Sequence, residues 1–394
     1  MRIALDPRTA LPVDADAATL AGRAWVPGAP GGPSPVLIRP DVVVDVGASF
    51  ATLAELMAEP DPATALREVG SAAPAIGATS AILGNSSADA RDPQKPFFLA
   101  PCDLQPVKAC GVTFAASLLE RVIEEHARGN PAEAEDIRRK VTAAIGGDLA
   151  RVKPGSAEAA RLKALLIERG LWSQYLEVGI GPDAEVFSKA PPMASVGTGA
   201  EIGIHPKSSW NNPEPEVVLV VNPQGAIVGA TLGNDVNLRD FEGRSALLLG
   251  RSKENNASSA IGPFVRLFDA HFGLDDVRGI EVALKVEGDD GFVLEGKSSM
   301  REISRDPADL VAQTIGQHHQ YPDGVLLFLG TMFAPTKDRE IRGQGFTHKL
   351  GDLVTISTAS LGALVNRVNH TSKVRPWDFG LAALMRNLKA RGRL

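Results

Sequence analysis

The clearest hydrophobic pattern in the chain is a run of five aliphatic residues at positions 217–221, within the stretch NNPEPEVVLVV (211–221). An unbroken apolar run of this length predicts a strand that is buried on both faces. Similar short runs recur after residue 175, at 280–288, 325–331 and 353–357 among others. Many strands at short spacing predict a β roll or barrel core for this part of the chain.

Helical periodicity dominates a separate region at about 117–170. Three segments carry it: SLLERVIEEHARGN, PAEAEDIRRKVTAAIGG and SAEAARLKALLIERG. Gly129, Gly146 and Gly170 stand near the expected helix ends, and Pro131 opens the second helix. We therefore expect a helical insertion, which could be either a lid or plain scaffold. A further helix is expected at 305–319.

The length of 394 residues favours two domains. Short strands and a helix fill residues 1–95, and the polar segment 84–96 is typical of a linker. We predict an α+β protein with a small N-terminal α+β domain over 1–95 and a second domain over 96–394.

Composition narrows the class of protein. The net charge is −6 and no long basic cluster occurs, which argues against a nucleic-acid partner. No apolar stretch approaches the roughly 20 residues of a membrane span, and the N-terminus lacks the pattern of a signal peptide. The two cysteines form no disulfide framework and are expected to be free and buried. These features predict a cytoplasmic protein.

Two glutamates stand at the start of the apolar run. Because residues i and i+2 of a strand share a face, Glu214 and Glu216 point the same way. Two buried like charges repel each other and lose hydration, so a cation is expected between them. It could be a lysine, an arginine or a metal ion.

The next acid, Asp235, follows a turn at NPQG (222–225). A two-residue hairpin loop would place position 216 opposite 231 and put Asp235 on the face of both glutamates. A three-residue loop with a glycine bulge is equally compatible and would reverse that face. Three converging carboxylates would suit Mg²⁺, with Mn²⁺ or Ca²⁺ as possible substitutes, while pairing with Arg or Lys remains the alternative.

These motifs resemble the fumarylacetoacetate hydrolase family. The segments EPEVVLVV and GATLGNDVNLRD are similar to its metal-binding signature, and EVFSKAPPMASVGTGAEI, SKENNASSAIGP, LFLGTMFAP and the closing GFTHKLGDLVTISTASLGALVNRV follow in family order. The resemblance covers roughly residues 100–394. It implies a mixed β-roll catalytic domain, Mg²⁺ bound by Glu214, Glu216 and Asp235, an active-site lysine at Lys253, and a homodimer or homotetramer.

The resemblance implies a chemical role for other residues of these motifs. Most of them also have a simpler structural explanation. Lys253 could stabilise negative charge on a substrate, with a pKa lowered by burial, or could be a surface lysine. Thr331 could bind a substrate carboxylate or be a turn residue. Arg239 could contact substrate, although a structural pair with Asp240 is favoured. Glu242 sits where hydrolytic members often carry a polar residue that contacts substrate.

One departure from the family pattern bears on the reaction. The segment ACGVTFAASLLER occupies the place of G-L-N-Y-x-x-H-x-x-E, so Ser117 stands where hydrolytic members carry the histidine that activates water. A serine hydroxyl cannot take that proton without a base of its own. Elimination of water needs no such histidine. Glu120, at the family's glutamate, and Glu242 are candidate acid/base groups, although a helical glutamate such as Glu120 is usually solvated.

The resemblance is strongest to the branch of sugar-acid dehydratases that act on 2-keto-3-deoxy acids. It implies conversion of 2-keto-3-deoxy-D-xylonate, the same compound as 2-keto-3-deoxy-D-arabinonate, to 2,5-dioxopentanoate and water in pentose breakdown. The alternatives are a Mg²⁺-dependent hydrolase or decarboxylase of acylpyruvate-type acids and a catalytically silent metal- or ligand-binding protein. The stereochemistry at C4, and pentonate against hexonate, stay open.

Overall fold

The computed structural model describes residues 1–145, 152–168, 170 and 172–394. Gly146, expected near a helix end, lies outside these residues. Within them the chain is α+β, as predicted, with a large mixed sheet, a five-stranded sheet and a two-stranded ladder. None of the helices in these ranges is long and apolar enough to cross a membrane. Cys102 and Cys110 are free and buried, as expected.

The large sheet has eleven strands and forms the centre of the molecule. Its strand order is β4-β3-β2-β1-β13-β11-β10-β16-β6-β7, with β5 paired to β1, and all pairings are antiparallel except β16 with β6. The bounds of its strands are β1 Leu20–Val26, β2 Gly32–Ile38, β3 Val42–Asp45, β4 Ala75–Ala78, β5 Phe97–Leu99, β6 Val107–Cys110, β7 Val186–Ala190, β10 Pro215–Val221, β11 Ile227–Asp235, β13 Ser259–Leu267 and β16 Val325–Phe328.

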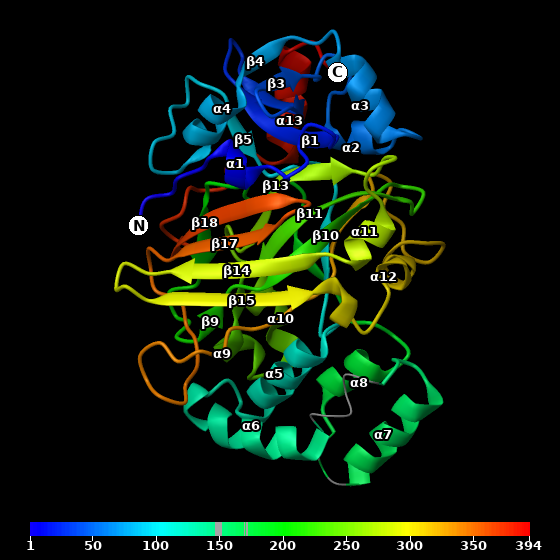
Figure 1. The fold of residues 1–394 in the computed structure, drawn as a ribbon, viewed down its shortest axis with the longest axis vertical. Coiled ribbons are helices and arrows are strands. Elements are labelled where there is room, and N and C mark those ends of the chain that lie inside the picture. Colours follow the sequence, from blue (N-terminus) through cyan, green and yellow to red (C-terminus); the bar gives the residue numbers. More distant parts are fainter. Residues whose placement is uncertain (146–151, 169, 171) are drawn as a thin grey trace.

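A five-stranded sheet packs against the large one (Figure 1). Its strand order is β15-β14-β17-β18-β8, and a short ladder of β12 and β9 lies apart from it. The bounds are β8 Glu201–Ile204, β14 Glu281–Glu287, β15 Val293–Ser299, β17 Leu353–Thr358, β18 Gly362–His370, β9 Asn211–Asn212 and β12 Asn237–Leu238.

Many of the helices lie at the two ends of the molecule, while α11 and α12 lie beside the sheets (Figure 1). One end holds α2 and α3 together with the C-terminal α13, and the opposite end holds α5 to α8 (Figure 1). The helix bounds are α1 Pro7–Ala10, α2 Leu53–Met57, α3 Pro62–Gly70, α4 Thr79–Ser86, α5 Ala115–His126, α6 Pro131–Ile145, α7 Ala157–Glu168, α8 Gln174–Ile180, α9 Arg239–Glu242, α10 Leu249–Lys253, α11 Leu274–Arg278, α12 Pro307–Thr314 and α13 Leu381–Ala390, with 3-10 turns at Ala246–Leu248 and Met300–Glu302.

Strand β10 is buried on both faces, as its apolar run predicts. Val217 and Leu219 belong to the core shared with the five-stranded sheet. Val218 and Val220 belong to a second core that includes Leu53 from the N-terminal end. Because alternate residues share a face, the face of Val218 and Val220 continues at the start of the strand as Glu214 and Glu216.

The N-terminal segment is joined to the rest by backbone pairing. β1 pairs with β13, so the first strands extend the large sheet beyond β13. Asn387 of α13 donates a hydrogen bond to the carbonyl of Gly31, which ties the C-terminus to the same end. A domain boundary near residue 95 stays a prediction.

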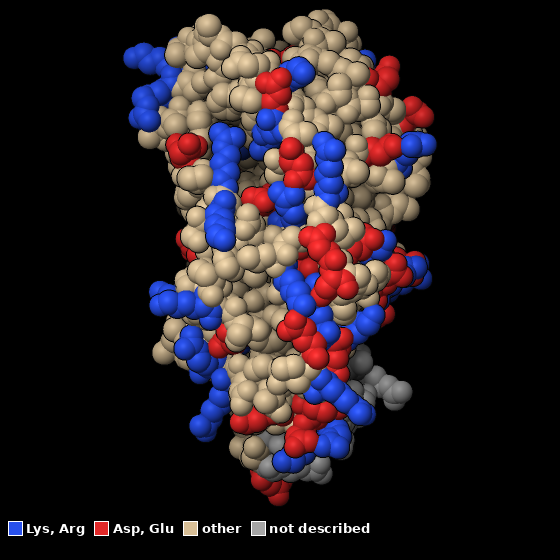
Figure 2. All heavy atoms as spheres, turned by 90° about the vertical axis from the view of Figure 1, so that its left-hand side faces the viewer, with Lys and Arg blue, Asp and Glu red and all other residues tan. Residues whose placement is uncertain are grey.

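Charged side chains of both signs are interspersed over the middle and lower parts of the face in Figure 2.

Close packing around β11 generates the first testable prediction. A Cβ added at Gly233 would lie 2.2 Å from the Phe328 ring and 2.6 Å from Val218. We expect Gly233→Ala to lower the free energy of unfolding by about 1–3 kcal/mol, because overpacking forces neighbours out of position. Urea unfolding measures the change. In the control, Gly84→Ala in α4, the added Cβ meets nothing within 4 Å. Equal stability of the two variants would contradict the packing argument.

Candidate active site

The hairpin of β10 and β11 places three carboxylates at one end of the large sheet. Glu216 faces Gly233, and the backbone N–H of Asp235 donates a 3.0 Å hydrogen bond to the carbonyl of Glu214. Asp235 therefore lies on the same face as both glutamates. Oxygen atoms from the three carboxylates all lie within 4.8 Å of one another, and the three side chains are buried.

Position 216 does not face 231, as it would with the two-residue loop, because the other alternative, a three-residue loop, forms and a β-bulge follows it. The loop is the three-residue alternative, since the N–H of Asn222 bonds to the carbonyl of Ala226 and Gly225 adopts φ +83°. A bulge between Val220 and Val221 then shifts the register by one more residue. Because the side-chain period of a strand is two, this second shift restores the face that the three-residue loop alone would reverse.

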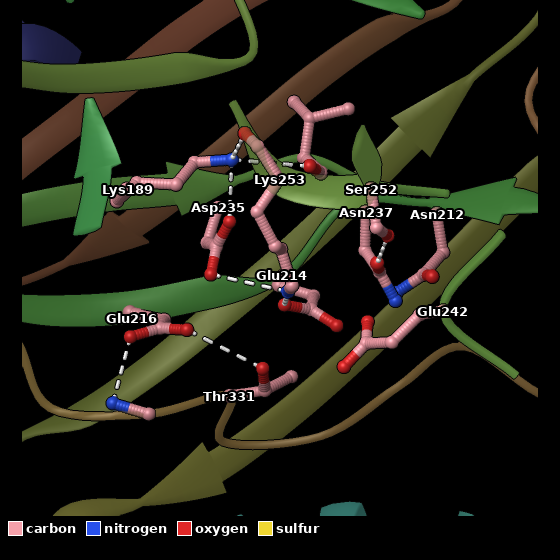
Figure 3. Close-up of polar contacts among 12 residues, drawn as sticks. Lys189, Asn212, Glu214, Glu216, Asp235, Asn237, Glu242, Ser252, Lys253 and Thr331 are labelled. Atoms are coloured by element: carbon pink, nitrogen blue, oxygen red, sulfur yellow. Dashed lines mark hydrogen bonds and ion pairs between the residues drawn. The ribbon is translucent and has the colours of Figure 1, made fainter. Parts of the chain in front are cut away.

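Most of the buried acids around this point contact a cation. Lys253 Nζ lies between Glu214 and Asp235, forming an ion pair with each, and Asp235 also lies 2.6 Å from Lys189 Nζ (Figure 3). Arg121 contacts Glu214 and Glu242, both at 3.0 Å. The arginine and lysine pairing that the sequence left open is therefore present for these acids.

Glu216 is the exception. Its carboxylate accepts hydrogen bonds from the N–H of Gly330 at 2.7 Å and from the Thr331 hydroxyl at 3.3 Å (Figure 3), and within the described ranges no Lys or Arg forms an ion pair with it. Burial, with repulsion from Asp235 and Glu214, raises the pKa of Glu216 well above its usual value. A buried acid in this position lacks a balancing positive charge.

The residues fit a divalent cation on this ground. Glu216 is buried and forms no ion pair with a Lys or Arg of the described residues, whereas Asp235 Oδ1 already lies 2.6 Å from Lys189 Nζ. Three carboxylates with oxygens this close offer the hard ligands that Mg²⁺ prefers. Glu214, Glu216 and Asp235 are the residues that could hold the ion.

A narrow pocket opens beside the three acids. Lys253, Thr331, Ser117 and Glu242 all line it. Burial raises the pKa of Glu242 to about 7, although Arg121 and Lys253 oppose the shift. A carboxyl group with a pKa near neutrality can both give and take a proton. The Ser117 hydroxyl donates to the carbonyl of Phe114 in the same helix.

The expectation for the pKa of Lys253 is wrong. Burial does lower it, but the nearby charges of Asp235, Glu214 and Glu242 outweigh burial and raise the pKa above its usual value. Lys253 is therefore a fixed positive charge. It can hold developing negative charge but does not act as a base near neutral pH.

Besides Glu216, two predicted site residues, Glu120 and Arg239, lie outside the pocket lining. Glu120 is bound by Arg138 at 2.8 Å and by Arg239 at 3.0 Å. Burial raises the pKa of Glu120, but the two guanidinium groups outweigh it and lower the pKa below its usual value. Arg239 also pairs with Glu124, and it lies 4.3 Å from the ring centre of Trp210. The roles of Glu120 in proton transfer and of Arg239 in substrate binding stay predictions.

The favoured pair of Arg239 with Asp240 is wrong. The carboxylate of Asp240 instead accepts hydrogen bonds from the Ser208 hydroxyl at 2.7 Å and the Ser209 N–H at 2.9 Å. Adjacent residues on a helix point in different directions, so Arg239 turns inward to the acids of α5 while Asp240 caps a loop.

Sequence reasoning missed three polar residues of the site. Arg121 and Glu185 line the pocket, and Lys189 contacts Asp235. Lys189 stands at the lysine of the quoted EVFSKAPP motif, so a signal was available for it. Burial raises the pKa of Glu185. A Cβ on Gly111 would lie 1.8 Å from Glu185 Oε2, so the carboxylate occupies the space that the glycine leaves.

The sequence segment that carries the three acids is similar to a known protein family. Residues 174–369 match the model of the fumarylacetoacetate (FAA) hydrolase C-terminal domain. This part of the chain is similar to the fumarylacetoacetate hydrolase family. The matched segment contains the three acids, Lys253 and Thr331, whereas Ser117, Glu120 and Arg121 precede it.

Two curated relatives are similar to about half of the chain. A protein of Haloferax volcanii named probable 2-keto-3-deoxyxylonate dehydratase is 31% identical over 201 residues, which cover 51% of this chain and 65% of the relative. A 2-dehydro-3-deoxy-D-arabinonate dehydratase of Saccharolobus solfataricus is 28% identical over 190 residues, which cover 48% and 60%. The matched part thus spans less than two thirds of either relative.

Solved structures share the fold of this chain. A 2-keto-3-deoxy-D-arabinonate dehydratase complexed with magnesium and 2,5-dioxopentanoate superposes with a TM-score of 0.56 at 20% identity, covering 89% of this chain and 99% of that chain. A fumarylacetoacetate hydrolase from Exiguobacterium antarcticum gives a TM-score of 0.55 at 15% identity, with coverages of 90% and 100%.

Binding of Mg²⁺ by the three acids is directly testable. We expect MgCl₂ to raise the thermal midpoint of the native chain, since an ion that binds only the folded state stabilises it. Glu216→Gln removes one charged ligand and should weaken Mg²⁺ binding by about 10-fold or more. Glu281→Gln, on the exposed start of β14, is the control. An equal Mg²⁺-dependent shift in both variants would exclude Glu216 as a ligand.

Proposed function

We propose that this chain is a Mg²⁺-dependent dehydratase that converts 2-keto-3-deoxy-D-xylonate to 2,5-dioxopentanoate and water. The observation that carries the proposal is the convergence of Glu214, Glu216 and Asp235 beside a pocket lined by Lys253 and by buried, protonatable carboxyl groups. The names of the two curated relatives support this substrate. The structural relative complexed with magnesium and 2,5-dioxopentanoate supports the ion and the product.

The chemistry of the substrate matches the groups that line the pocket. Mg²⁺, when bound, would polarise the 2-keto group and make the C3–H bond more acidic. Lys253 provides a permanent positive charge for the enolate that forms when the C3 proton leaves. The Thr331 hydroxyl, which donates to Glu216 at 3.3 Å, would turn to donate to the substrate carboxylate.

Proton transfer requires a base at C3 and an acid at the C4 hydroxyl. Glu185 and Glu242 both line the pocket, and burial raises the pKa of each. One carboxylate takes the C3 proton, and one carboxylic acid protonates the hydroxyl as the C4–O bond breaks and water leaves. A proton then moves from C5 to C3, which gives the C4=C5 enol, and the proton of the enol hydroxyl moves to C4 as the C5 aldehyde forms, so the balance is loss of one water.

The serine at position 117 argues against the alternative reaction, the hydrolysis of acylpyruvates. Serine stands where hydrolytic members carry a histidine, and its hydroxyl donates to a backbone carbonyl of its own helix. No base partner for this hydroxyl is found among the described residues. Hydrolysis of acylpyruvates would need another group to activate water.

The reaction can be tested with purified protein. We expect 2-keto-3-deoxy-D-xylonate to be consumed with formation of 2,5-dioxopentanoate, detected by ¹H NMR, and EDTA should stop turnover until MgCl₂ is restored. Mn²⁺ and Ca²⁺ should be tried as replacements. Consumption of acetylpyruvate alone would refute the dehydratase proposal. Full turnover by Glu216→Gln would refute the role of the ion.

Substitution of Glu185 and of Glu242 can show which of the two acts as the base and which as the acid. We expect Glu185→Gln and Glu242→Gln each to lower kcat by about 10²–10⁴-fold, the usual contribution of acid–base catalysis. In D₂O the variant that keeps the base should still exchange the C3 protons of the substrate, while the other should not. Glu177→Gln, on α8 outside the pocket, is the control. Unchanged kcat in both glutamine variants would exclude them.

The resemblance to the family also leads us to propose a homodimer or homotetramer. Light scattering coupled to size-exclusion chromatography measures the mass of the assembly and would show a monomer of 41.5 kDa if this proposal fails.

A further inference from the structure

A second and larger cavity lies away from the acids. It has a volume of about 500 Å³, within the range of small-molecule sites, and shares no lining residue with the pocket of Lys253. β1, β5, the segment 193–201 and the segment 374–379 before α13 form its walls. Much of the lining comes from outside residues 174–369, so the part of the chain that matches the family does not build this cavity alone.

Three arginines line the cavity without a carboxylate partner. Arg23 is only 5% exposed, its guanidinium donates to the carbonyl of Cys102, and its Nε has no hydrogen-bond partner. Arg91 donates to the carbonyl of Ser86, and its Nε is also unpaired. In the described part of the chain, neither these two nor Arg375 forms an ion pair with an acid. Arg23 is buried, Arg91 is half-buried and Arg375 is exposed, so the lack of a counter-ion is most unfavourable at Arg23.

The charges of Arg91 and Arg375 repel each other. Burial, together with repulsion from Arg375, lowers the pKa of Arg91 to about 10. The acid Glu201 lines the same cavity, but Arg367 and Asn369 already hold its carboxylate at 2.8 and 3.2 Å. The other acid of the lining, Asp378, is exposed. The interior of the cavity therefore favours an anion.

Aromatic rings supply an apolar wall beside the arginines. Trp25 stacks on Phe97 with ring centres 6.3 Å apart and meets the edge of Phe379 at 5.6 Å. Arg91 lies over the ring of Phe97 at 4.6 Å. Trp377 also lines the cavity and is 48% exposed. Flat aromatic surfaces of this kind bind planar, apolar groups.

We propose that this cavity is a second binding site, for a small organic anion whose acidic group meets Arg23, Arg91 and Arg375 and whose planar body packs on Trp25 and Phe379. The site is independent of the proposed dehydratase reaction. Much of the cavity lining lies outside the residues that match the family model, and the names of the relatives mention no second ligand.

Quenching of tryptophan fluorescence can test the site, because two of the four tryptophans line it. The probes are 4-nitrobenzoate and 4-nitrophenyl phosphate as anions and 4-nitrobenzamide as their neutral counterpart. We expect saturable quenching by at least one anion, with a Kd about 10-fold lower than that of the amide. Equal binding of all three probes, or no saturable binding, would overturn the proposal.

Variants locate the bound anion. Arg91→Gln and Arg375→Gln should each raise the Kd by about 5-fold or more, since each removes a charged partner. Arg386 is an exposed arginine on α13, and Arg386→Gln removes the same charge outside the cavity. This variant should change the Kd by less than about 2-fold, because exposed charges contribute little. Quenching should vanish in Trp25→Phe/Trp377→Phe and persist in Trp172→Phe. Persistence in the double variant, or no effect of either arginine variant, would place the anion elsewhere. Binding should be the same with and without EDTA, which separates this result from any failure of the metal site.

Discussion

The burial of like-charged carboxylates at the start of β10 is the interaction on which the rest of the site depends. An ionised acid in a protein interior is tolerated only when positive charge or hydrogen-bond donors replace its lost water. Lys253, Lys189 and Arg121 provide this charge for Glu214 and Asp235. Glu216 receives only neutral donors from Gly330 and Thr331. The uneven distribution of cations, and not the mere presence of acids, marks where a metal ion would fit.

The sheet determines which acids meet. Position 235 reaches the face of Glu214 because a three-residue loop and a bulge act together. Either feature alone would turn the carboxylate of Asp235 toward the opposite core. The geometry of the hairpin at Val221 and Gly225, which lie beyond the acids toward the loop, is therefore as important for the site as the acids themselves.

The sequence predicted the local features of the fold and only part of the site. The buried strand at 217–221 and the helices starting near 117, 131 and 157 follow from periodicity, which depends on neighbouring residues. Two hairpin loops stayed open, and the observed register follows from neither alone, because no residue type marks the bulge between Val220 and Val221. Arg121 and Glu185 were missed because only tertiary packing brings them to the pocket, and neither position differs locally from a solvated helix or loop residue. The pKa of Lys253 was misjudged because burial was considered without the three neighbouring acids.

The helical end of the molecule is linked to the acids by charge. Arg121 projects from α5, and its guanidinium contacts Glu214, Glu242 and Glu124. Removing one partner of a buried ion pair leaves the other uncompensated, so a displacement of α5 would expose two acids of the pocket to unbalanced repulsion. Because Glu242 has a pKa of about 7 in the presence of this arginine, loss of the contact would favour its protonated form. Arg121 of α5 thus counteracts the effect of burial on the pKa of a candidate catalytic group, which ties this helix to the chemistry proposed for the pocket.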